Sequence, residues 1–334
     1  MSAVETHSPS SPSYRVALDE ELRLSSGDAQ DEAYRRHLGR LSHASVVKHF
    51  DAYADIDWDA PEMRIDPADP RWELDPEDSL ARTAWYQSQP PEIRSAIGLH
   101  MIANFMKLGL QFESVLKRGL LDFAWRLPNG SPEFRYVYHE VIEEAQHSLM
   151  FQEFVNRTKL DPPGLPAWQR VGARLVVRFA RTFPELFFIF VLGGEDPIDH
   201  VQREMLRGRR ELHPLFQRIS QIHVTEEARH LSFARLYLRR QVPRLGAVKR
   251  ALLRFRTPLI MGQMAQLMMR PSRQIVDRYS IPAEVLREAY KSAHHRKRTA
   301  AAIRKVRDLC VELDVVTPRT EPLWRAFGLM AAQH

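Results

Sequence analysis

Apolar residues recur at helical spacing through most of the chain, and turn residues divide this pattern into segments. The longest segment predicts a helix over residues 92–127 that ends at the Pro-Asn-Gly turn at 128–130. A Ser-Pro-Glu sequence at 131–133 begins a second helix that runs to about residue 159, because serine caps free N–H groups and proline fits the first turn. Both helices are long enough to form the sides of a bundle.

The same helical pattern continues to the end of the chain, and no segment shows the alternation of apolar and polar residues expected of a strand. Further helices are predicted over about a dozen residues from 167 and over residues 184–207, 215–240, 247–270, 282–294 and 297–313. Residues 1–45 are expected to form a flexible lead-in with a short amphipathic stretch, and the proline-rich residues 51–91 an irregular, wrapping segment. We therefore predict an all-α fold with one domain over residues 46–334, built from a four-helix bundle core at about 92–240 and flanking C-terminal helices at about 247–330.

The composition narrows the class of protein. Hydrophobic residues make up 44% of the chain and charged residues 27%, as in folded globular proteins. The single cysteine, Cys310, excludes an internal disulfide framework and a Cys-x-x-Cys metal site, and it favours a reducing compartment. The longest apolar run, residues 186–194, is far shorter than the roughly 20 residues that cross a bilayer. We therefore expect a cytoplasmic protein without a transmembrane segment.

The net charge of +6 is unevenly distributed. Residues 51–78 contain 11 acidic and 2 basic side chains, whereas residues 239–308 contain 18 basic and 4 acidic ones. Such asymmetry can indicate an anionic partner, but we favour the interpretation that the two regions face each other within the fold or a dimer. No nucleic-acid partner is expected, and the sequence leaves open whether the basic half contacts another anionic partner.

Two segments of the chain repeat the pattern Glu-x-x-His, at Glu144/His147 and at Glu227/His230. Residues three positions apart share a helix face, so the carboxylate and the imidazole can bind one metal ion together. A chain of this composition would contain about one such pattern by chance, so each pair alone is weak evidence. Because the metals of two-metal sites lie about 3.5–4 Å apart, Glu144 and Glu227 are expected to bridge them.

The spacing of two further acids strengthens this interpretation. Glu113 lies 31 residues before Glu144, and Glu195 lies 32 residues before Glu227, both within apolar helical segments. One Glu from each of two helices and Glu-x-x-His from the other two form the ligand set of ferritin-like di-iron and di-manganese bundles. We therefore predict a ferritin-like fold with two metal ions, iron or manganese. In the alternative, the buried acids pair with arginines.

Three neighbouring residues extend the predicted site. His223 lies four residues before Glu227, on the same helix face, and we favour a third histidine ligand over a packed core histidine. Glu143 and Glu226 each precede a motif glutamate, and such acids can support metal-bound histidines by hydrogen bonding. The alternative for these two acids is a position on the solvated outer flank of the helix.

At these residues the sequence resembles the di-iron p-aminobenzoate N-oxygenase family, which makes nitroarenes from arylamines. The resemblance runs from about residue 46 to residue 316 and includes the acidic segment 50–57, the Gly-Glu pair at 194–195 and the motif at 223–230 with its extra histidine. It implies a homodimer, two iron ions, O₂ as co-substrate, a peroxo intermediate and an external electron donor such as a reductase or ferredoxin-like protein. On the family pattern, Glu143 would support His230 and Glu226 would support His147.

The resemblance also implies where the substrate binds. By this alignment Phe105 replaces a tyrosine of the aminobenzoate enzyme, and the arginine that holds the substrate carboxylate corresponds most closely to Arg298. The expected pocket residues lie one or two turns from the ligands: Phe105, Leu108, Gly109, Phe112, Phe190, Gly194 and Arg298. We expect a more apolar pocket, an aromatic or otherwise apolar amine or acid as substrate, and p-aminobenzoate itself as a poor one.

The sequence favours an O₂-activating di-iron enzyme that N-oxygenates an arylamine or monooxygenates a related small apolar molecule. The main alternative is a ferritin-like ferroxidase or peroxide-detoxifying protein, although the long flanking segments favour a walled substrate pocket. A basic binding protein without catalysis, acting through residues 239–307, would leave the acids within the apolar helices unexplained.

Overall fold

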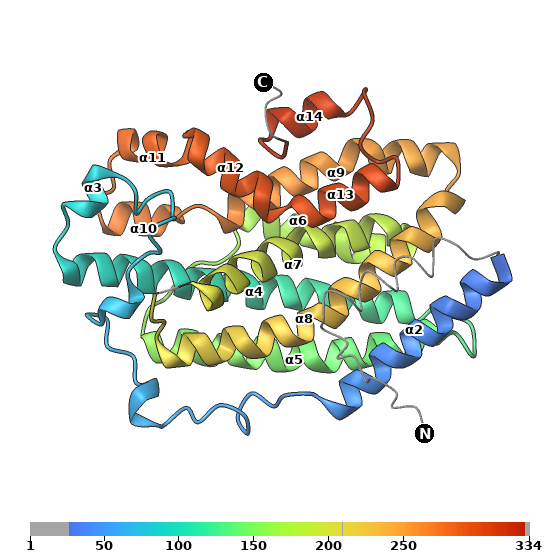
Figure 1. Cartoon of the computed structure of the whole chain (residues 1–334), viewed down its shortest axis with the longest axis horizontal. Helices are drawn as coiled ribbons and strands as arrows, with labels where there is room; N and C mark the ends of the chain where they lie inside the picture. Colours follow the sequence, from blue (N-terminus) through green and yellow to red (C-terminus); the bar gives the residue numbers. More distant parts are fainter. Residues whose placement is uncertain (1–26, 209, 331–334) are drawn as a thin grey trace, which may run out of the picture.

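The structure is a computed structural model that describes residues 27–208 and 210–330. These residues form an all-α fold, with α-helices and short 3₁₀ turns but no strand (Figure 1). The α-helices are α2 (Gly27–Val47), α3 (Ala84–Gln87), α4 (Pro91–Ala124), α5 (Pro132–Thr158), α6 (Ala167–Thr182), α7 (Pro184–Arg207), α8 (Pro214–Gln241), α9 (Ala247–Met268), α10 (Arg273–Arg278), α11 (Ala283–Tyr290), α12 (Ala293–Ala302), α13 (Arg304–Glu312) and α14 (Glu321–Ala326). Three 3₁₀ turns, η1 (Pro61–Met63), η2 (Pro70–Trp72) and η3 (Val242–Arg244), complete the described elements.

The long helices α4, α5, α7 and α8 form the central bundle, with α4 packed on α5 and α7 packed on α8. Proline lies in the first turn of each of these helices, where a missing N–H is tolerated. The predicted bounds of α7 are confirmed residue for residue, and those of α4, α5 and α8 to within three residues. The prediction of an all-α bundle fold is thus confirmed.

The remaining helices cover the bundle from two directions. α6 packs against α4 and α7, and α9, α12 and α13 pack against α7, so that the C-terminal helices lie on one side of the bundle (Figure 1). The largest apolar cluster joins the bundle to these covering helices, and it includes Phe187, Phe188 and Phe233. No helix of the described residues is long and apolar enough to cross a membrane.

The described part of the lead-in expected over residues 1–45, which was predicted to include a short amphipathic stretch, is a packed helix. Residues from Gly27 onward form α2, which packs against α5 and α8 and buries Tyr34 and Leu38. The buried face of α2 also contains polar side chains such as His37 and Ser42, so the apolar pattern that marks a packed helix is weak. Residues 1–26 lie outside the described part of the chain.

The C-terminal helices are also more divided than predicted. The segments expected at 282–294 and 297–313 form three helices, α11, α12 and α13. The division between α11 and α12 follows from Ser292, whose hydroxyl accepts a hydrogen bond from the His295 N–H at 3.0 Å and caps α12. Such a cap competes with the continuous helix that apolar spacing alone predicts.

The acidic segment before α4 is held by basic side chains from several elements. Arg157 of α5 contacts Asp59 at 3.1 Å, and Arg298 of α12 contacts Asp78 at 3.4 Å. Gln146 of α5 accepts a hydrogen bond from the Ala52 N–H at 2.9 Å. This segment therefore joins the bundle to the basic C-terminal helices within one chain.

Candidate metal centre

The interior of the bundle contains a dense cluster of carboxylates and imidazoles. α4 and α7 contribute one glutamate each to the predicted set, whereas α5 and α8 contribute the Glu-x-x-His pairs. The structure brings all seven residues together, each at most 1% exposed: Glu113, Glu144, His147, Glu195, His223, Glu227 and His230. Ionisable groups at this depth lose their charge, pair with a group of opposite charge, or bind an ion, because an isolated buried charge is strongly unfavourable.

The two Glu-x-x-His pairs face each other across the bundle. The Nδ1 atom of His230 lies 3.0 Å from Glu144 Oε1 and 3.0 Å from Glu227 Oε1. The Nδ1 atom of His147 lies 3.2 Å from Glu144 Oε2 and 3.5 Å from Glu227 Oε1. Each of the two carboxylates therefore reaches both histidines, which is the position of a carboxylate that can bridge two metal ions.

The far nitrogen of each histidine contacts the acid that precedes the motif glutamate of the opposite helix. His230 Nε2 lies 2.7 Å from Glu143 Oε2, and His147 Nε2 lies 2.8 Å from Glu226 Oε2. A carboxylate that accepts a hydrogen bond from one ring nitrogen leaves the other nitrogen to a metal, so Nδ1 faces the cluster. Burial raises the pKa of Glu143, but the hydrogen bond from His230 and the guanidinium of Arg229 outweigh it and lower this pKa to about 2.

Glu113 and Glu195 complete the cluster from α4 and α7. Glu113 Oε1 lies 3.9 Å from His147 Nδ1 and 3.7 Å from His223 Nε2, and Glu195 Oε2 lies 4.0 Å from His223 Nε2. Neither oxygen of Glu195 has a hydrogen-bond partner among the described residues. Burial, and after it the carboxylate of Glu227, raises the pKa of Glu195 well above its usual value.

His223 presents one free nitrogen to this cluster. Its Nδ1 atom lies 2.8 Å from the side-chain oxygen of Gln202, so Nδ1–H donates and Nε2 carries the lone pair. Burial lowers the pKa of His223 to about 4, which keeps the ring in the neutral form that binds metals. Sequence reasoning missed Gln202, although it lies seven residues after Glu195 and therefore on the same face of α7.

Sequence reasoning also left out Glu140, which lies one turn before Glu144 on α5. It is fully buried, and its carboxylate forms a close set with those of Glu144 and the ring of His230. Burial raises the pKa of Glu140 to about 8. The signal was present in the sequence, because Glu140 occupies the position in the first motif that His223 occupies in the second.

The unpaired atoms of the cluster fit divalent metal ions. Four sets of three side chains bring donor atoms within 4.8 Å of one another. Donor atoms without a hydrogen-bond partner in the described part of the chain include Glu113 Oε2, Glu227 Oε2, both oxygens of Glu195 and Nε2 of His223. Carboxylates this close repel one another in an apolar interior unless protons or cations neutralise them. Carboxylate and imidazole donors without thiolates suit iron or manganese.

Small and aromatic residues shape the space beside the ligands. A Cβ atom at Gly194 would collide with the ring of Phe112, so glycine lets α7 approach α4 next to Glu195. Phe112 stacks on Phe190 with ring centroids 4.9 Å apart. A Cβ atom at Gly109 would lie 3.0 Å from the ring of Phe151. These rings form an apolar wall around the α4 side of the cluster.

A cavity of about 1130 Å³ lies among α4, the segment before α6, α9 and α10. Of the expected pocket residues, only Leu108 lines it, five residues before Glu113 and therefore about 7.5 Å away along α4. Phe105 is half-buried on α4 and does not line the cavity. The aromatic wall described above also lies outside the cavity lining.

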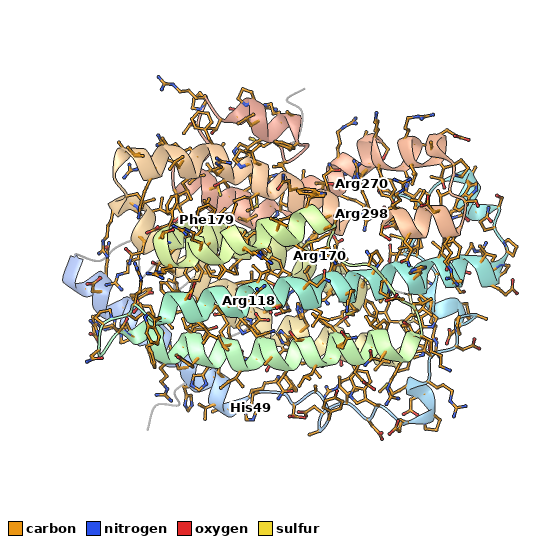
Figure 2. All side chains as sticks on the ribbon, turned by 180° about the vertical axis from the view of Figure 1, so that it is seen from behind. His49, Arg118, Arg170, Phe179, Arg270 and Arg298 are labelled. Atoms are coloured by element: carbon orange, nitrogen blue, oxygen red, sulfur yellow. The ribbon has the colours of Figure 1, made fainter. Side chains whose placement is uncertain are left out.

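Three arginines line this cavity, Arg270, Arg273 and Arg278, and the expected Arg298 is not among them. Arg298 pairs with Asp78, whereas Arg270 has no carboxylate partner among the described residues. The Arg270 guanidinium lies 5.6 Å from the Tyr290 ring centroid, and its Nε atom is buried without a hydrogen-bond partner in this part of the chain. Burial lowers the pKa of Arg270. Figure 2 draws Arg270 and Arg298 close to each other, and both guanidinium groups lie near enough to Tyr290 to affect its pKa. That Arg298 holds a substrate carboxylate stays a prediction.

A helical bundle in which facing Glu and Glu-x-x-His side chains meet in the interior has the architecture of the ferritin-like metal-carboxylate proteins. Within this class the chain belongs to the AurF family, because the family model described as p-aminobenzoate N-oxygenase AurF matches residues 31–314. The chain is also 42% identical, over 89% of its length and 88% of theirs, to uncharacterized proteins of Mycobacterium bovis and Mycobacterium tuberculosis. No solved structure gives a significant match to this chain.

Proposed function

We propose that this protein is an O₂-activating dinuclear iron oxygenase that N-oxygenates an amine or monooxygenates a related small apolar molecule. The observation that carries the proposal is the buried cluster of seven predicted ligands, with donor atoms left unpaired toward one another. Membership of the AurF family supports iron and O₂ as cofactor and co-substrate. On the ligand pattern of ferritin-like bundles, Glu113, Glu144 and His147 would hold one metal. Glu195, Glu227 and His230 would hold the other, with His223, which lies close to members of both groups, as an additional ligand.

The iron pair, when bound, supplies the activation of O₂ with electrons from an external reductase or ferredoxin-like donor. The protein positions the two ligand histidines through Glu143 and Glu226, which fix the ring tautomers. Phe112 and Phe190 exclude water from the α4 side, where a reactive site would otherwise be open to side reactions. We also propose that the protein acts as a homodimer, as the resemblance of its sequence implies, and that it lies in the cytoplasm, as its single cysteine favours.

We further propose that the cavity beside Leu108 admits the substrate and that Arg270 holds an anionic group of it. Arginine binds carboxylates through two parallel hydrogen bonds. No ion pair joins Arg270 to a carboxylate among the described residues, and the one acid of the cavity lining, Asp277, pairs with Arg273 at 3.5 Å. Trp168 and Phe327 add apolar surface to the same lining. The substrate class that fits is a small apolar or aromatic amine that carries an acidic group.

The direct test is incubation of the reduced, iron-loaded protein with O₂ and a panel of arylamines, with products identified by mass spectrometry. We expect hydroxylamine, nitroso or nitro products from the more apolar members and slower conversion of p-aminobenzoate. Conversion of p-aminobenzoate alone, unaffected by Phe105→Tyr, would contradict the proposed pocket. Rapid oxidation of Fe²⁺ or consumption of peroxide without any organic product would instead favour the ferroxidase alternative.

A further inference from the structure

The two metal-binding helices carry an additional donor at the same position. His223 lies four residues before Glu227, and Glu140 lies four residues before Glu144. A spacing of four residues places both donors on the ligand-bearing faces of α8 and α5, one turn before the motif. Glu140 is therefore a second donor of the cluster, after His223, that lies outside the two Glu-x-x-His motifs.

The surroundings of Glu140 provide no hydrogen-bond partner. Its side chain is 0% exposed, and neither carboxylate oxygen has a hydrogen-bond partner within residues 27–208 and 210–330. One turn earlier on α5, Tyr136 packs on Phe233 with ring centroids 4.9 Å apart, so this side of Glu140 is aromatic. An ionised carboxylate that is buried without hydrogen bonds is unfavourable, and a bound cation removes that cost.

The donors that do lie near Glu140 are metal ligands of the proposed site. Glu140, Glu144 and His230 form one of the sets whose donor atoms lie within 4.8 Å of one another. His223 belongs to two such sets, one with Glu113 and His147 and one with Glu195 and Glu227. Each additional donor thus shares a set with the histidine of the opposite helix, which is the arrangement expected of a two-fold repeat.

We propose that Glu140 is an eighth protein ligand and binds the metal held by Glu195 and His230. This inference rests on the proposed dinuclear site and adds a residue to it. The two metals then differ in their ligands, because only the metal held by Glu195 and His230 gains the carboxylate of Glu140. The site with the additional carboxylate is the harder and more negatively charged one, so it favours hard, oxygen-preferring ions such as manganese over softer ones.

The test compares Glu140→Gln with Glu133→Gln as a matched control. Glu133 is also buried on α5, two turns before Glu140, but it pairs with Arg240 at 3.3 Å and lies outside the cluster. Anaerobic titration of each full-length variant with Fe²⁺ or Mn²⁺ gives the stoichiometry and both affinities. We expect Glu140→Gln to weaken one of two metals by about ten-fold or more and to leave the other nearly unchanged, whereas Glu133→Gln keeps both affinities.

Thermal unfolding with and without metal separates a ligand from a structural carboxylate. A ligand predicts that metal-free Glu140→Gln melts close to the metal-free wild type, because Glu140 has no hydrogen-bond partner to lose, and that it gains less from added metal. A purely structural role predicts the same destabilisation with and without metal. The Co²⁺-loaded variant should also change its visible absorption, since one ligand is lost.

Three outcomes are distinguishable. Two metals bound with unchanged affinities and an unchanged Co²⁺ spectrum in Glu140→Gln would overturn the role of Glu140 and leave the proposed function standing. Failure of the wild type to bind two metals would overturn both. Selective loss of one metal affinity together with a changed Co²⁺ spectrum would support the assignment.

Discussion

The helix pair α4–α5 and the helix pair α7–α8 carry the same set of motif residues, but the residues around the two sets differ. Each pair supplies one glutamate from its first helix and a Glu-x-x-His motif from its second. They differ one turn before the motif, where the first pair has Glu140 and the second has His223. The shared arrangement of helices determines where two metals could lie. The difference between Glu140 and His223 makes the surroundings of the two half-sites unequal in charge.

The two halves also differ in what holds their supporting acids. Glu143 contacts Arg229 at 2.8 Å, whereas Glu226 lies 3.5 Å from the same guanidinium and accepts a hydrogen bond from the Phe50 N–H at 3.2 Å. The first contact is made within the bundle, and the second comes from the acidic segment before α4. The segment that wraps the bundle therefore takes part in positioning His147 through Glu226.

The largest expected effect comes from removing a carboxylate that both halves share. Glu144 reaches both histidines, so Glu144→Ala should weaken binding of both metals by more than about 100-fold. Elemental analysis should then find a metal content well below two per chain. Glu133→Ala serves as a control on the same helix. Undiminished metal content at two per chain in Glu144→Ala would remove Glu144 from the site.

Removal of the donor that distinguishes the second half should affect one metal only. His223→Ala is expected to keep the fold and to lower one metal affinity by about 10- to 100-fold. The matched variant Gln202→Leu keeps the ring but removes the hydrogen bond to Nδ1, so its effect should be smaller. Metal titrations and stopped-flow absorption after mixing with O₂ check both. Traces indistinguishable from those of the wild type would return His223 to the role of a packed core residue.

A finer comparison replaces each of the two acids that support the histidines, Glu143 and Glu226, in turn. Glu143→Gln should weaken the metal bound by His230, and Glu226→Gln the metal bound by His147, each by about ten-fold or somewhat more. Glu143→Gln also leaves Arg229 without its nearest carboxylate, so it should lower the melting temperature more than Glu226→Gln does. Titration calorimetry and thermal unfolding measure the two effects separately. Equal destabilisation by both variants would contradict the asymmetry of the Arg229 contact.

The residues of the buried cluster could be predicted from the sequence because a helix fixes which residues share a face, and the spacing of Glu113, Glu144, Glu195 and Glu227 repeats. Glu140 fits the same helix face, but a buried acid without a motif is ambiguous until its neighbours are known. That Arg270 lines the cavity could not be predicted, because the place of α9 and α12 over the bundle depends on long-range packing and on the cap at Ser292. Likewise, the polar buried face of α2 concealed a packed helix.

The cavity proposed to bind the substrate is lined by residues of both halves of the molecule. Its lining includes residues of α4, in the first half, and of α9, which packs on α7 of the second half. Arg270→Gln should raise the KM for an acidic substrate by about 10- to 100-fold with a smaller change in kcat, because a charged hydrogen bond is lost away from the reacting atoms. Arg298→Gln is the matched control, since its guanidinium pairs with Asp78. A larger rise in KM for Arg298→Gln than for Arg270→Gln would restore the expectation drawn from sequence.

The smallest effect concerns α2, which packs on α5 and α8 and so links the two halves. His37 Nε2 lies 2.9 Å from Ser232 Oγ of α8, and burial lowers the pKa of His37 to about 4. Because the folded pKa lies below the unfolded value of about 6.5, the unfolded chain takes up the proton first as the pH falls. The contribution of neutral His37 is therefore fully present above pH 6.5 and is lost progressively as the pH falls toward 4.

His37→Gln keeps a side chain that can bond to Ser232 but cannot titrate. Between pH 7 and pH 4.5, the metal-free wild type should lose about 1–2 kcal/mol more unfolding free energy than this variant, as measured by urea denaturation. His43→Gln, an exposed position on the same helix, should follow the wild type. An identical pH dependence in all three proteins would show that the His37 contact does not couple α2 to the second half through its protonation state.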